Sequence, residues 1–124
     1  INGDGAMLMS LGVLVTIASV RAANYTLIVL DNGLYEVTGG QATAAAGTHV
    51  DFAAMARAAG FASASNFTAL DDWRANAARC LSESGPRFIC LKVESVGDAY
   101  ALPPAGSVVE RLKAFGAALT SNAM

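Results

Sequence analysis

Two short turns combine residue types that could bind a metal ion. Asp4 lies between two glycines directly before an apolar run, and Asn32 lies in the stretch LDNGLYE. Mg²⁺ prefers six oxygen ligands and commonly takes one or two carboxylates together with substrate phosphates. The Asp4 carboxylate, the Asn32 amide oxygen and a backbone carbonyl just after Gly33 could supply three of these oxygens. Gly33 would allow the sharp turn that aims this carbonyl.

The first of these turns also offers donors for an anion. The backbone N–H groups of Gly5 and Ala6 would lie at the start of a helix, where unpaired donors and the helix dipole favour phosphate oxygens. A carboxylate beside phosphates is repulsive unless a cation lies between them. The residues therefore predict that phosphate and Mg²⁺ bind together.

The order of elements is what would bring the two turns together. Asp4 and Asn32 are 28 positions apart, and one helix and one strand lie between them. Helices and strands that alternate in this way are typical of an α/β fold with a parallel sheet flanked by helices. In such sheets, ligands bind beyond the carboxyl ends of the strands. The expected helices cover about residues 6–21, 51–60, 68–83 and 107–119, and the expected strands cover 25–30, 87–93 and, weakly, 61–67. Asp51 is expected to be the N-cap of the second helix and Gly60 to lie just past its end, and the spacing of Thr68 and Asp71 predicts a capping box at the start of the third.

Several finer expectations follow from the pattern of apolar residues. The helix over 6–21 is apolar nearly all round, which predicts that it is covered on more than one side. Residues 31–49 are small and polar and predict a long loop, and no strand is expected before Asp4. In the last helix, one apolar stripe is expected to face a core. This stripe consists of Val108, Leu112, Phe115 and Leu119.

Composition and charge exclude several classes of function. The net charge is −2 and the eight Lys and Arg residues are scattered, which does not favour nucleic-acid binding. Residues 6–20 are too few to cross a bilayer, and the acid before them does not suit a signal peptide. Cys80 and Cys90 lack metal-type spacing and are expected to be buried thiols in a reducing cytoplasm. Because only 15% of residues are charged, we expect a partner to cover part of the surface.

The amino-acid sequence around the two turns resembles that of a known family. GDG followed 28 positions later by Asn, with a strand between, is similar to the diphosphate-binding, C-terminal type domain of thiamine-diphosphate-dependent enzymes. Over residues 2–43, the sequence resembles small decarboxylases of the sulfopyruvate and phosphonopyruvate type. The resemblance implies that Asp4, Asn32 and the Leu34 carbonyl bind Mg²⁺. The cofactor-binding positions that it implies are Gly3, Asp4, Gly5, Ala6, Asn32, Gly33, Leu34 and Tyr35.

The resemblance also implies what the chain does and what it needs. Thiamine diphosphate would act as the electron sink when a 2-oxo acid loses carbon dioxide. The glutamate that activates the cofactor would come from a separate pyrimidine-binding domain or subunit, in a homo- or hetero-oligomer. We expect no catalytic residue in this chain, and Glu36 at most lines the cleft. Residues 1–120 would form the domain, without its N-terminal part, and residues 121–124 (SNAM) resemble the remnant of an expression tag.

Other interpretations stay open at this point. A different thiamine-diphosphate enzyme, such as a carboligase of the acetolactate-synthase kind, would carry the same turns. A non-catalytic cofactor-binding or scaffold subunit would also keep the fold. His49, the only histidine, is either a solvated loop residue, which we favour, or a proton-transfer group near a bound 2-oxo acid. The resemblance suggests that GGQ (39–41) becomes ordered over substrate.

Overall fold

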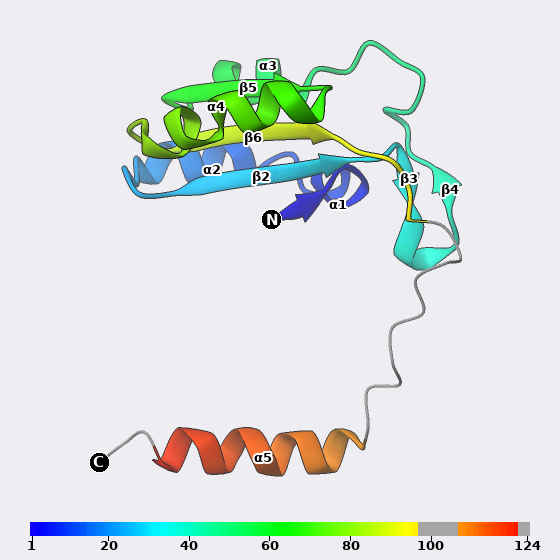
Figure 1. Cartoon of the computed structure of the whole chain (residues 1–124), viewed down its shortest axis with the longest axis vertical. Coiled ribbons are helices and arrows are strands. Elements are labelled where there is room, and N and C mark those ends of the chain that lie inside the picture. The colour runs from blue at the N-terminus through cyan, green and yellow to red at the C-terminus, as the bar shows by residue number, and fades with distance from the viewer. Residues whose placement is uncertain (97–106, 122–124) are drawn as a thin grey trace.

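A parallel sheet forms the centre of the molecule. The computed structural model describes residues 1–96 and 107–121 (Figure 1). Four strands form the main sheet, and every neighbouring pair of strands is parallel. In their order across the sheet, they are β1 (Asn2–Gly3), β2 (Thr26–Asp31), β6 (Arg87–Lys92) and β5 (Ser63–Phe67). The predicted α/β class is therefore confirmed.

Helices cover both faces of this sheet. Figure 1 shows α1, α2 and α3 on one face and α4 on the other, and the two groups of packed core residues agree with this division. The helices are α1 (Asp4–Met9), α2 (Val13–Val20), α3 (Phe52–Ala59), α4 (Leu70–Ser82) and α5 (Val108–Ser121). The helices predicted over 51–60, 68–83 and 107–119 and the predicted strands are thus present with changed boundaries, whereas residues 6–21 do not form one helix.

The alternation of side chains along each strand creates the two halves of the core. In β2, Leu27 and Val29 point to the side of α1–α3, whereas Ile28 points to the side of α4. In β6, Phe88 and Ile89 divide in the same way, and both are almost completely buried. Because central parallel strands bury both faces, they consist of nearly continuous apolar residues. Burial of each large side chain of this kind stabilises the fold by about 1.5–3 kcal/mol.

The expected single helix over residues 6–21 is wrong. It is divided into α1 and α2 by a non-helical turn at Ser10, which has φ −137° and ψ 36°. The Ser10 hydroxyl donates to the Ala6 carbonyl at 2.8 Å, and a glycine follows two residues later. Serine side chains compete for backbone partners and glycine disfavours helix, which accounts for the break. α2 is also not covered all round, because Val15 and Val20 are largely exposed.

Residues 31–49 contain more structure than the predicted loop. Two short strands pair antiparallel in a separate ribbon, and a 3₁₀ turn lies between them. They are β3 (Leu34–Tyr35), η1 (Glu36–Thr38) and β4 (Gln41–Ala42). The expectation that no strand precedes Asp4 is also wrong, since β1 pairs with β2 there. Strands of two residues are too short to produce a recognisable pattern.

The ends of two helices test the capping predictions. Asp51 is the N-cap of α3 and accepts from the Ala54 N–H at 2.9 Å, and Gly60 ends the helix with φ 105°. Both features were expected from the sequence. α4 instead begins at Leu70, after Ala69, with no side-chain cap. The helix start expected at residue 68 is therefore two residues too early.

The apolar stripe of α5 is not buried as predicted. Val108, Leu112 and Phe115 are 65%, 63% and 62% exposed, and Figure 1 shows α5 apart from the sheet. The side chain of Leu119 lies outside the described residues, as do residues 122–124 of the expected tag remnant. Periodicity identifies an apolar side of a helix but not what covers it. Within the described part of the chain, no helix is long and apolar enough to cross a membrane.

Candidate functional site

The two predicted turns lie side by side at the carboxyl edge of the sheet. Gly3, the last residue of β1, pairs with Leu30 near the end of β2. Asp4 then opens α1, and Asn32 directly follows β2. The parallel pairing therefore places the first and second turns at neighbouring strand ends, as the topology predicted.

Asp4 is a buried carboxylate, with only 1% of the residue exposed. Its Oδ2 atom accepts from the Thr43 hydroxyl at 2.9 Å, and Thr43 is itself 4% exposed. The Thr43 backbone N–H donates to the Gly33 carbonyl at 2.8 Å. Thr43 thus joins the two turns and fixes one oxygen of the Asp4 carboxylate. Sequence reasoning missed it because nothing in its spacing links it to Asp4.

The second turn is held by the side chain of Asn32. Its Oδ1 atom accepts from the Leu34 N–H at 2.9 Å, and its Nδ2 atom donates to Glu36 Oε2 at 2.7 Å. Between them, Gly33 has φ +74°, a conformation that glycine adopts without strain. The Asn32 amide therefore has a defined orientation within this turn.

Gly5 is required by the close approach of an aromatic ring. A Cβ atom at this position would lie only 2.5 Å and 2.6 Å from Cδ1 and Cε1 of Tyr35. No side chain could be added there without displacing the ring. The Tyr35 ring therefore packs directly on the first turn of α1, where Gly5 and Ala6 lie.

These residues line one hollow of about 380 Å³, which we call the motif cavity. Its lining is Gly3, Asp4, Gly5, Ala6, Met9, Leu30, Asn32, Leu34, Tyr35, Glu36, Val37 and Thr38. Seven of the eight predicted cofactor-binding residues are among them, and the eighth, Gly33, lies between two that are. Glu36 lines the cavity as expected.

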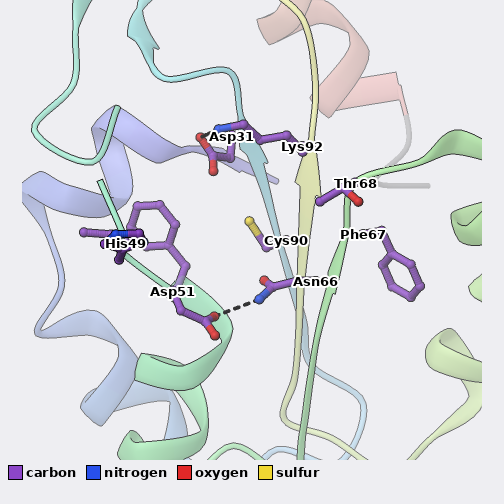
Figure 2. Close-up of a pocket in the computed structure, with 10 residues that line it drawn as sticks. Asp31, His49, Asp51, Asn66, Phe67, Thr68, Cys90 and Lys92 are labelled. Atoms are coloured by element: carbon purple, nitrogen blue, oxygen red, sulfur yellow. Dashed lines mark hydrogen bonds and ion pairs between the residues drawn. The ribbon is translucent and has the colours of Figure 1, made fainter. Parts of the chain in front are cut away.

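A second hollow of about 310 Å³ lies at the carboxyl ends of β2, β5 and β6, and we call it the strand-end cavity (Figure 2). Its lining is Asp31, His49, Val50, Asp51, Phe52, Asn66, Phe67, Thr68, Cys90 and Lys92. His49 is exposed and lies here rather than in the motif cavity. The structure therefore does not bring this histidine together with the predicted cofactor-binding residues.

Most charged groups of the strand-end cavity are paired with one another. Asp31 and Lys92 form an ion pair at 3.1 Å, and Asp51 accepts from the Asn66 amide at 2.8 Å. The hydrogen bonds from Asn66 and the Ala54 N–H hold the pKa of Asp51 below its usual value. The pKa of the Cys90 thiol is raised to about 12, mainly because the thiol is buried, so it stays protonated.

The donor set of the motif cavity suits a hard cation better than a soft one. In the described ranges, no group of three or more His, Cys, Asp or Glu side chains could hold a metal ion. The predicted set instead combines one carboxylate, one amide oxygen and one backbone carbonyl. Oxygen donors of these kinds, completed by phosphate oxygens and water, are what Mg²⁺ uses.

Several known proteins have sequences similar to this one. A phosphonopyruvate decarboxylase of Streptomyces viridochromogenes is 34% identical over 120 residues, which cover 93% of this chain and 29% of the relative. One of Streptomyces hygroscopicus is 38% identical over 75% of this chain and 23% of the relative. The sulfopyruvate decarboxylase subunit beta of Methanothermobacter thermautotrophicus is 43% identical over 49% of this chain and 32% of its own length.

The chain thus spans less than a third of the two phosphonopyruvate decarboxylases that it matches. A protein-family match covers most of the chain. Residues 1–91, which contain both turns and all of the parallel sheet except Lys92 at the end of β6, match the thiamine pyrophosphate (thiamine diphosphate) enzyme, C-terminal TPP binding domain. This chain therefore belongs to the family of C-terminal thiamine-pyrophosphate-binding domains.

Proposed function

We propose that this chain is the Mg²⁺- and diphosphate-binding domain of a 2-oxo-acid decarboxylase of the phosphonopyruvate or sulfopyruvate type. One observation carries the proposal. Asp4 is a fully buried carboxylate that lines the motif cavity beside Asn32 and Leu34, and none of the ion pairs in the described part of the chain includes it. A buried charge of this kind is costly unless a cation compensates it.

The residues that line the motif cavity are suited to binding Mg²⁺ and a diphosphate. With Oδ2 of Asp4 held by Thr43, its second carboxylate oxygen would bind Mg²⁺, together with Asn32 Oδ1 and the Leu34 carbonyl. The N–H groups of Gly5 and Ala6, in the first turn of α1, would donate to diphosphate oxygens. In this arrangement the cation separates the Asp4 carboxylate from the diphosphate, which removes their repulsion.

The chain's own contribution is to bind and orient. Bound thiamine diphosphate would supply the electron sink for loss of carbon dioxide, and the protein would supply position and electrostatics. We propose that the activating glutamate comes from a pyrimidine-binding domain or subunit. The sulfopyruvate relative is named as a subunit, which supports the presence of a partner chain. Large apolar side chains exposed on α1 and α2, such as Met9 and Val15, are consistent with such a covering.

Calorimetric titration of the chain tests this proposal. We expect thiamine diphosphate and inorganic pyrophosphate to bind in the presence of Mg²⁺ and to bind far more weakly in its absence. Thiamine without phosphates is the matched control and should not bind measurably, since the proposed contacts all go to the diphosphate and the metal. Equal binding of thiamine and thiamine diphosphate, or binding indifferent to Mg²⁺, would contradict the proposal.

The reaction itself needs the completed enzyme. With a pyrimidine-binding partner present, consumption of a 2-oxo acid with release of an aldehyde would support a decarboxylase. A hydroxyketone product would identify a carboligase instead. Cofactor binding without consumption of any 2-oxo acid would identify a non-catalytic subunit.

A further inference from the structure

The carboxylate of Glu36 connects two segments that are distant in sequence. Its Oε2 atom accepts from Asn32 Nδ2 at 2.7 Å, in the turn after β2. Its Oε1 atom accepts from the Val96 backbone N–H at 2.7 Å, in the segment that follows β6. Glu36 is half-buried and lines the motif cavity, so these bonds form at the edge of the proposed cofactor site.

An asparagine amide has two chemically different ends, and only its oxygen can bind a cation. If the amide turned over, it would present two N–H donors to the metal instead. Because a carboxylate accepts but cannot donate, Glu36 can bond only to the Nδ2 end of Asn32. The Oδ1 atom accepts one bond, from the Leu34 N–H, and keeps a second lone pair for a ligand bond.

We propose that Glu36 is a positioning residue that fixes the orientation of the Asn32 amide so that its oxygen, and not its nitrogen, faces the cation. The inference rests on the proposed function, because it assumes that Asn32 binds Mg²⁺. Glu36 acts through Asn32 and is neither a metal ligand nor the group that activates the cofactor.

The substitution Glu36→Gln tests this role because it keeps the size of the side chain. The new side chain has one acceptor oxygen for two donors. If this oxygen accepts from the Val96 N–H, its NH₂ group faces the NH₂ group of Asn32. Asn32 then loses this bond or turns over and loses the bond from Leu34. Glu36→Met, which has no acceptor oxygen, removes the bond from Asn32 in either case. We expect the affinity for Mg²⁺ to fall by about tenfold, as is usual when a partner of a metal ligand is removed.

A loss of affinity could also come from the lost negative charge, and a double-mutant cycle separates the two causes. In the Asn32→Asp background, both carboxylate oxygens are equivalent and no orientation needs to be fixed. We therefore expect Glu36→Gln to have little effect or to improve binding in that background. A pure charge effect would weaken binding equally in both backgrounds.

The experiment titrates Mg²⁺ into the four chains of this cycle in the presence of thiamine diphosphate. Glu94→Gln serves as the control, since Glu94 is an exposed acid just after β6 that does not line the motif cavity. An equal loss in both backgrounds, or a loss no larger than for Glu94→Gln, would overturn the inference. If the unchanged chain shows no binding linked to Mg²⁺, the proposed function fails and this inference fails with it.

A second measurement does not depend on the ligand. In the NMR spectrum of the ligand-free chain, the NH₂ group of Asn32 should be protected from hydrogen exchange and should lose this protection in Glu36→Met, which has no acceptor oxygen. Thermal unfolding of the same samples shows whether the fold is retained. Unchanged protection in a folded Glu36→Met chain would overturn the inference, whatever the calorimetry gives.

Discussion

The motif cavity and the strand-end cavity lie along the same edge of one parallel sheet, yet their acidic side chains have different kinds of partner. In the strand-end cavity, Asp31 is paired with Lys92, and Asp51 accepts from Asn66. In the motif cavity, the more deeply buried Asp4 has a hydroxyl partner, and none of the ion pairs in the described ranges includes it.

This difference shows which cavity is suited to a cation. Acids in the strand-end cavity already have partners within the chain, so an added cation would have to displace them. A buried carboxylate without a cationic partner gains most from a cation supplied from outside. The partners of the acidic side chains therefore distinguish the two neighbouring cavities, whereas the presence of acidic residues in each cavity does not.

The largest effect on the stability of the fold is expected from Gly5→Ala. The added Cβ would approach Tyr35 to 2.5 Å, so the ring must move away from α1. Overpacking of this kind costs about 1–3 kcal/mol of unfolding free energy. Binding of thiamine diphosphate should weaken as well, because Tyr35 lines the same cavity. Chemical denaturation and calorimetry measure the two effects.

Gly12→Ala is the matched control for this substitution. No atom lies within 4 Å of a Cβ built at Gly12, and its φ of −58° suits any residue. Its unfolding free energy should not fall and should rise by up to about 1 kcal/mol, because alanine is favoured over glycine at a position with helical φ and ψ. Equal stability losses for both alanine variants would show that the contact between Gly5 and Tyr35 is unimportant.

A smaller effect is expected from Thr43→Val, which removes the hydroxyl that donates to Asp4 and keeps the shape of the side chain. The affinity for Mg²⁺ in the presence of thiamine diphosphate should fall by roughly tenfold, because the Asp4 carboxylate is no longer held. Thr43→Ser should retain the affinity. Thr48→Val is the control, since the exposed Thr48 hydroxyl donates to the Ala45 carbonyl, accepts from the Val50 N–H and does not line the motif cavity. Full affinity in Thr43→Val would contradict this role.

The smallest effect is expected in the strand-end cavity, from Asp51→Ala. Loss of the α3 cap should cost about 1 kcal/mol of unfolding free energy at neutral pH, while cofactor binding stays unchanged. The pKa of Asp51 in the folded chain lies below its ordinary value of 3.8. The stabilisation is therefore fully present above pH 3.8 and is lost as the pH falls through the pKa of the folded state. The two chains should therefore converge in stability in acid. Weakened cofactor binding would show that the two cavities are not independent.

The sequence was sufficient to predict where the main turns meet. A single crossover between parallel strands leaves little freedom, so the neighbouring positions of Asp4 and Asn32 followed from one helix and one strand. The N-cap at Asp51 and the glycine after α3 were also predicted, because capping depends on local residue types. Features that depend on local residue types or on the order of helices and strands could therefore be predicted from the sequence.

Contacts that depend on the path of a long connection were not predictable. Thr43 reaches Asp4 across 39 positions, through a ribbon whose strands have only two residues each. The break at Ser10 was hidden by the apolar residues on both sides of it. The stripe of α5 was recognised from its period, but a period carries no information about what covers a helix.

The most direct test of the central claim is a calorimetric titration of Mg²⁺, in the presence of thiamine diphosphate, into the unchanged chain, Asp4→Asn and Asp31→Asn. Asp31 is the matched control, because it is the neighbouring acid that lines the strand-end cavity and is paired with Lys92. We predict that Asp4→Asn abolishes binding linked to Mg²⁺ and leaves the ligand-free chain at least as stable, since a buried charge is removed. Asp31→Asn should bind nearly as the unchanged chain does. Binding by Asp4→Asn at the affinity of the unchanged chain would contradict the account.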